Sequence, residues 1–364
     1  MIVAKGTCFL LFAYEVAQAI DLDAAEHRIV AGAQRQTVKH KRRAPPYFEY
    51  HPAPLRVTRD AEALAFGHHR TAPAVEVVLY DFGAVSVSYA IPIEGPLADL
   101  PALSHELWGN ERLLEDSRRH VEEVLHVLDD AALRTRIAGF VEDYAIYQVE
   151  AFTAPREAAD LWTDHAHTVA QILRAEPQPL SVQEIGDATA LRLSFGPNDA
   201  TIIDTDATLL FDPEGDDVRA VLEFANTQLV EMRFLDGQLD DALERSYEAM
   251  SRRAGRLALL GRYDRDLRRL ARLQVDSAIL FEQVSNALKL VGEQYLARVY
   301  ALASRRFHLA EWDAAITRKL ETLESIYAKT ADRAATRRLE VLEWIIIILI
   351  AISLAVSVAP MLSH

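Results

Sequence analysis

The chain has 364 residues, of which 50% are hydrophobic and 26% are charged, so it is long enough to bury a sizeable core. Its formal net charge of −15 argues against a protein that coats nucleic acids, because phosphate binding depends on basic surface. The single cysteine, Cys8, excludes an internal disulfide and a cysteine-rich metal site.

Proline usage divides the chain into two stretches. Thirteen of the 14 prolines lie at or before Pro213, and the next is Pro360. Because proline interrupts helices, the first stretch should contain strands, turns and short helices, whereas the second should be almost entirely helical. The predicted fold class is an α+β N-terminal domain (1–213), an all-α, coiled-coil-like helical hairpin (214–342) and one C-terminal transmembrane helix (343–362).

The N-terminal stretch shows the patterns of strands and short helices. Residues 1–14 include a short apolar segment without a signal-peptide cleavage site, which predicts a buried strand. Residues 75–80 and 84–89 predict two strands joined by a turn at Asp81-Phe82-Gly83; these letters also occur in kinase metal-binding loops, but the accompanying kinase motifs are missing. Further strands are predicted at 145–152, 190–195 and 207–211, and helices at 23–32, 110–128 and 156–174.

A basic run stands out in this acidic chain. Lys39, Lys41, Arg42 and Arg43 lie together, and two prolines follow them. One interpretation is a contact with an anionic surface, either lipid headgroups or ribosomal RNA. The other is a solvated loop, which is the more common role of such a run. These four residues are the candidate anionic contact.

The sequence predicts no catalytic, cofactor-binding or metal site, and therefore no enzyme. Asp164, His165 and His167 lie in a predicted helix, where residues two apart point in different directions. An acidic cluster between 204 and 217 lacks the glycine and the alternating ligands of a calcium loop, and favours a strand followed by an acidic turn. The cluster comprises Asp204, Asp206, Asp212, Glu214, Asp216 and Asp217. A metal-dependent hydrolase acting through this cluster is an alternative function.

Apolar residues in the helical stretch recur at alternating spacings of four and three. One series runs from Ser277 to Leu302, and another from Ile316 to Val341. This spacing is typical of a coiled-coil seam, so the two segments predict an antiparallel hairpin that bends near 305–308. An exposed seam also favours self-association, and a homo-oligomer is expected.

The chain ends in an apolar segment. Residues 344–362 form a run of 19 without a charge, which as a helix would be about 28 Å long and match the hydrocarbon core of a bilayer. Trp344 would lie at the membrane interface, and Arg337 and Arg338 belong to the basic segment before it. The positive-inside rule then places the N-terminal bulk in the cytoplasm or an equivalent compartment. The sequence thus predicts a single-pass, tail-anchored membrane protein with the lipid bilayer as a partner.

Three stretches, 13–22, 77–85 and 342–350, carry a family resemblance. The last, which begins Leu-Glu-Trp-Ile-Ile-Ile, is the most specific. In order and spacing they resemble the family named for "required for meiotic nuclear division", also called the Rmd/Sif or YagE-like family. Of that family's Ser-His-Ala-Leu-Ala-Gln-Ser stretch, residues 222–229 keep only the Ala and Gln character.

The resemblance implies an oligomeric integral membrane protein without established enzymatic activity, whose mitochondrial relatives support organelle translation by tethering ribosomes. The leading prediction is accordingly a membrane scaffold or interaction protein that tethers a partner, either the ribosome or a membrane complex. A sensor of anionic lipid, acting through the basic run, is a further alternative. No cofactor is expected.

Overall fold

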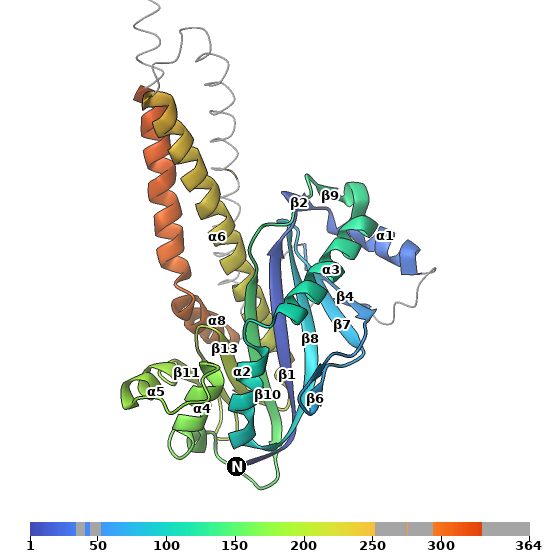
Figure 1. Ribbon diagram of the computed structural model, residues 1–364, viewed down its shortest axis with the longest axis vertical. Helices are drawn as coiled ribbons and strands as arrows, with labels where there is room; N and C mark the ends of the chain where they lie inside the picture. Colours follow the sequence, from blue (N-terminus) through green and yellow to red (C-terminus); the bar gives the residue numbers. More distant parts are fainter. Residues whose placement is uncertain (34–40, 44–51, 252–274, 276–293, 330–364) are drawn as a thin grey trace, which may run out of the picture. The chain divides into compact units, whose positions relative to one another are not determined.

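The computed structural model describes residues 1–33, 41–43, 52–251, 275 and 294–329 (Figure 1). These residues belong to two compact units. The sheet unit comprises 1–235 and 278–313, and the helical unit comprises 236–277 and 314–364. Residues 214–235 and the described part of 278–313 therefore pack within the sheet unit, whereas the sequence predicted that they belong to the helical stalk.

Nine strands among the described residues form one mixed sheet, in the order β11-β12-β13-β10-β1-β8-β7-β4-β3. Neighbouring strands are antiparallel except β10 and β13, which are parallel. The strands are β1 (Ile2–Glu15), β3 (Lys41–Arg43), β4 (Leu55–Asp60), β7 (Ala74–Leu79), β8 (Ala84–Pro96), β10 (Glu142–Phe152), β11 (Arg192–Leu193), β12 (Ala200–Ile203) and β13 (Ala207–Phe211). Two small ladders pair β2 (Ala19–Ile20) with β9 (Ala132–Leu133) and β5 (Ala65–Phe66) with β6 (His69–Arg70).

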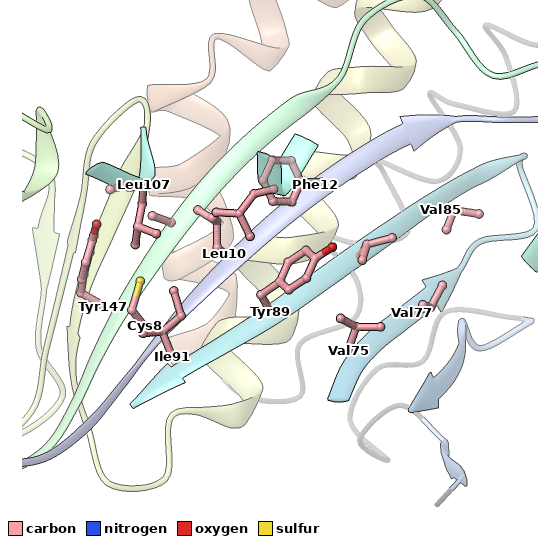
Figure 2. Packing of buried hydrophobic residues seen from close by; sticks show 14 of the residues in the cluster. Cys8, Leu10, Phe12, Val75, Val77, Val85, Tyr89, Ile91, Leu107 and Tyr147 are labelled. Carbon is pink, nitrogen blue, oxygen red and sulfur yellow. The ribbon is translucent and has the colours of Figure 1, made fainter. Parts of the chain in front are cut away.

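The first face of the sheet carries the apolar core. Cys8, Leu10 and Phe12 of the central strand β1 point to this face, where they pack with Tyr89 of β8 and Tyr147 of β10 (Figure 2). The helices that contribute to this core are α1 (Leu22–Ala33), α2 (Leu100–Leu107), α3 (Glu111–Leu128) and α4 (Ala166–Leu173); α5 (Val182–Ala188) packs against α4. Full burial of each large apolar side chain contributes about 1.5–3 kcal/mol, which makes this layer the main source of stability.

The second face is contacted by residues 216–235 of α6 (Asp216–Ser251) and by α8 (Gln294–Arg306). Because side chains alternate along a strand, Phe9, Leu11 and Ala13 of β1 point to this face. The guanidinium of Arg219 on α6 lies 4.0 Å from the ring centroid of Phe9. The hydroxyl of Tyr300 on α8 donates a hydrogen bond to Gln228 of α6 at 2.6 Å. The two helices thus contact each other as well as the sheet.

In the helical unit, α6 pairs with the helix that spans 309–329. Lys319 Nζ lies 2.7 Å from Asp236 Oδ1 and 2.6 Å from Asp240 Oδ1, and the Ser246 hydroxyl donates to Tyr327 at 3.3 Å. Residue numbers rise together along both helices, so the pair is parallel. The sequence predicted an antiparallel hairpin of 277–302 with 316–341, and parts of both segments lie outside the described residues. The spacing of apolar residues identifies a seam but not its partner.

Buried apolar residues line the seam of this parallel pair. They are Leu239 and Ala242 of α6, and Ile316 and Leu323 of the second helix. Ile316 and Leu323 belong to the second series found in the sequence. Their partner in the described part of the chain is α6, which is distant in sequence from that series.

The predicted membrane anchor is corrected by the structure. Among the residues described, no helix is both long enough and apolar enough to cross a membrane. This finding contradicts the predicted single-pass fold class, the tail anchor and the membrane localisation. Segment 343–362, with the interface residues Trp344, Arg337 and Arg338, lies outside the described residues. The prediction rested on the length, apolar composition and flanking charges of the segment, and these do not establish that a membrane-spanning helix forms.

Candidate functional site

Charged and hydroxyl side chains are also buried on the second face of the sheet. Ser86 and Ser88 of β8 are 1% and 5% exposed, and Glu223 of α6 is 2% exposed. Both serines alternate with the apolar residues Val85, Val87 and Tyr89 that point to the first face. Strand alternation therefore directs polar groups of β8 toward α6.

Arg56 is the centre of one buried network on this face. It lies on β4 and pairs with Glu76 of β7 and with Glu223 of α6, where the Nη2–Oε2 distance is 2.7 Å. The Ser86 hydroxyl donates to the other oxygen of Glu223 at 2.8 Å. Charge-assisted bonds of this kind are the strong ones, and they tie α6 to three strands of the sheet.

The pKa values in this network follow from burial and from the two glutamates. Burial acts to lower the pKa of Arg56, but Glu223 and Glu76 outweigh it, and the pKa is raised above its usual value. Burial raises the pKa of Tyr80, and Glu223 raises it further. Arg56 is therefore a permanent cation and Tyr80 a neutral hydroxyl at physiological pH.

Asp204 is the centre of a second buried network. Its side chain is fully buried in the turn between β12 and β13. Arg174 follows α4, and its Nε lies 2.7 Å from Asp204 Oδ2. Arg306 ends α8, and its Nε donates a hydrogen bond to Asp204 Oδ1 at 2.6 Å. Asp187 of α5 accepts from both arginines, at 2.6 Å from Arg174 and 3.1 Å from Arg306. Two arginines and two aspartates thus join α4, α5, α8 and this turn.

This network bears on whether the carboxylates of the acidic cluster are available for catalysis or metal binding. Each side-chain oxygen of Asp204 already faces a guanidinium, so this carboxylate is engaged by fixed positive charge. Burial raises the pKa of Asp206, and the charge of Asp204 raises it further. The rest of the chain segment forms β13 followed by a turn in which Asp212 accepts from the Glu214 backbone at 2.8 Å, as the sequence predicted. The described residues contain no group of three or more His, Cys, Asp and Glu side chains that could hold a metal ion.

The structure separates the other residues that the sequence singled out. Lys41, Arg42 and Arg43 form β3, an end strand of the described sheet that pairs with β4, whereas Lys39 lies outside the described residues. Asp81-Phe82-Gly83 makes the turn between β7 and β8, which confirms the predicted hairpin.

The predicted helix 156–174 is interrupted. A short 3-10 turn covers Ala158–Leu161, α4 begins at Ala166, and His165 is the residue before it. The apolar periodicity continues through the interruption, so it could not reveal the break.

The two networks were not predicted from the sequence. Their arginines, Arg56, Arg174 and Arg306, lie in unremarkable surroundings, and their partners are far away in the chain. One local signal was present: Glu223 lies between apolar residues of a helix that is buried on this side. A charged residue on a buried helix face needs a partner of opposite charge.

The described residues define a mixed α/β protein in which one sheet face holds an apolar core and the other is tied to long helices by buried charges. A model of the family described as "Uncharacterized protein MJ0711, N-terminal domain" matches residues 5–217, and the chain belongs to this family. A relative, the uncharacterized protein MJ0711 of Methanocaldococcus jannaschii, is 22% identical over 222 residues, which cover 60% of this chain and 67% of the relative. No solved structure matches the chain.

The family match covers the sheet and ends at the beginning of α6. It includes Arg56 and Asp204 but not their partners Glu223 and Arg306. It does not test the resemblance to the Rmd/Sif family, which stays a prediction.

Proposed function

We propose that this protein is a scaffold or interaction protein that binds a partner protein through its helical unit, and that it is not an enzyme. The observation that carries the proposal is the engagement of Asp204 by Arg174 and Arg306. This carboxylate belongs to the acidic cluster of the alternative hydrolase function, and its charge is used to hold elements of the sheet unit together.

The helical unit supplies the contact surface. Helix α6 has 36 residues, so it is about 54 Å long at roughly 1.5 Å per residue. Its last turns and residues 314–329 bury a narrow seam and expose many charged side chains, such as Arg245, Arg318 and Glu324. Long helices with charged outer faces are well suited to binding another protein, and their charges select the partner.

A protein is favoured over a nucleic acid as the partner. The net charge of −15 repels phosphate at long range. A basic partner surface, on a different protein or a second copy, would be complementary to the acidic residues of the helices.

The test is a pull-down of the tagged full-length protein from a cell extract, with mass spectrometry and sizing of the eluate. The test variant exchanges two charges of the helical unit, Arg318→Glu with Glu324→Arg, so that the net charge is unchanged. The matched control exchanges the exposed α3 ion pair, Arg118→Glu with Glu122→Arg. We expect a stoichiometric partner or a discrete homo-oligomer with the wild type and the control, and its loss with the test variant.

Two results would contradict the proposal. One is a monomer that elutes alone under low-salt conditions. The other is a partner that the test variant retains and the control loses, since that would place binding on α3 of the sheet unit.

A further inference from the structure

His120 is a buried histidine on α3 that the scaffold function does not use. Its side chain is 5% exposed, and its ring centroid lies 6.5 Å from that of Tyr89 on β8. Both ring nitrogens are buried, and neither makes a hydrogen bond within the part of the chain that the structure describes. Buried polar groups almost always have partners, so this ring calls for an explanation.

Two carboxylates lie close to the ring but are bonded to other groups. Nε2 is 3.4 Å from Asp116 Oδ2, and Nδ1 is 4.0 Å from Glu123 Oε2. The same Asp116 oxygen accepts a hydrogen bond from the Tyr89 hydroxyl at 2.7 Å, and the same Glu123 oxygen accepts from Arg59 of β4 at 2.8 Å. The two carboxylates therefore hold α3 to the sheet.

The surroundings favour the neutral imidazole. Burial lowers the pKa of His120 most strongly; Asp116 and Glu123 oppose this effect, and Arg59 and Arg119 add to it. Two titratable hydroxyls of the sheet also contact α3: that of Tyr89, which bonds Asp116, and that of Tyr14 on β1, which bonds Ser117 at 2.7 Å. The net result is a pKa below the ordinary value of His, which is about 6.5.

We propose that His120 is a proton-sensitive switch that controls how firmly α3 is held to β4 and β8. A proton taken from solvent gives an imidazolium, which requires charge-assisted hydrogen bonds that Asp116 and Glu123 can supply. The carboxylate oxygens nearest the ring already accept from Tyr89 and Arg59, so a buried imidazolium would compete with these two donors for the same oxygens. Protonation therefore weakens the two contacts that hold α3 to the sheet.

The direction of the pH effect follows from the lowered pKa. The unfolded or locally opened chain binds the proton more readily than the closed form does. The neutral His120 favours the state in which α3 is held to the sheet. This contribution is complete above about pH 6.5 and is lost as the pH falls through the lower pKa that His120 has in the folded protein.

The test is hydrogen exchange of the full chain at about pH 7.5 and about pH 5.5, values that lie on either side of the ordinary His titration, corrected for intrinsic rates. The variant is His120→Gln, and the matched control is His126→Gln, an exposed histidine on the same helix. We expect peptides of 111–128 to exchange several-fold faster at the lower pH in the wild type and in the control. In the His120→Gln variant, the ratio of the exchange rate at the lower pH to the rate at the higher pH should fall to near unity.

A second measurement is independent of whether the variant folds. The imidazole resonances of His120 in the wild-type chain, followed by NMR, should titrate below about pH 6.5. The proposal is overturned if His120 titrates at or above that value, if wild-type α3 shows no excess exchange at low pH, or if His120→Gln keeps the full pH dependence.

Discussion

Glu223 shows how a single buried charge depends on its neighbours. Its two oxygens are held by Ser86 and by Arg56, a residue 167 positions away in the chain. Removing one member of a buried ion pair leaves the other charge desolvated and uncompensated, whereas replacing both by apolar residues can be nearly neutral. The same two residues can therefore be costly to change singly and tolerant of change together.

We expect Arg56→Met to lower the free energy of unfolding by about 3–5 kcal/mol, and Glu223→Met to do the same. The double variant should lose clearly less than the sum, because the two buried charges are removed together and only the half-buried Glu76 loses its cation. Urea unfolding of the four proteins measures this coupling. Loss of the exposed Arg118–Glu122 pair, as a control, should cost under about 1 kcal/mol. Additive losses in the double variant would show that the two side chains act independently.

At the scale of elements, the hairpin of β7 and β8 depends on the backbone of Gly83. This residue has φ of +101°, and a Cβ added to it would lie 1.8 Å from the Ala17 carbonyl oxygen. Its own carbonyl accepts hydrogen bonds from Val16 and Ala17, at 2.9 and 3.1 Å. The turn therefore joins the hairpin to the end of β1, and a side chain here would push the two apart.

We expect Gly83→Ala to destabilise the protein by more than Gly95→Ala does. Gly95 also has positive φ, +110°, but nothing lies within 4 Å of its added Cβ. Backbone strain alone should cost about 1–2 kcal/mol at either position, so the excess at Gly83 measures the clash with Ala17. Thermal and urea unfolding of both variants give the comparison. Equal losses would mean that β1 can move aside at no cost.

At the scale of the whole molecule, contacts between distant parts of the sequence hold the sheet unit together. Arg306 at the end of α8 reaches Asp204, 102 positions earlier, and Asp187, 119 positions earlier. Burial acts to lower the pKa of Arg306, but its bonds to the two aspartates raise it, so the cation is retained. The guanidinium of Arg306 thus adds to the Tyr300–Gln228 hydrogen bond in holding α8 on the second face.

We expect Arg306→Met to cost about 1–3 kcal/mol, since Asp204 keeps Arg174 as a partner but loses its bonds to Arg306. Hydrogen exchange should increase in 294–306 and in the β12–β13 turn, and less in the helices of the first face. Arg305→Met changes the exposed neighbour on the same helix and should leave exchange unaltered. If both variants behave alike, the pairing with Asp204 does not anchor α8.

Local sequence patterns by themselves determined several elements of this protein. Short apolar runs bounded by turn residues identified the strands at 75–80, 84–89 and 207–211, and the turn at Gly83, because a buried strand needs only a few consecutive apolar residues. The helix 110–128 was also predicted, and it begins at Glu111 after Asn110, whose side chain accepts from the Leu113 backbone at 3.2 Å.

Only the tertiary structure decided how these elements meet. The order of strands, the parallel pairing of β10 with β13, and the pairing of α6 with 309–329 depend on contacts between distant segments. The pairs Arg56–Glu223 and Arg306–Asp204 have the same origin, and the sequence around each residue does not identify its partner. The physical reason is that the spacing of apolar residues is a property of one helix or strand. Strand register and charge pairing arise only when folding brings separate elements into contact.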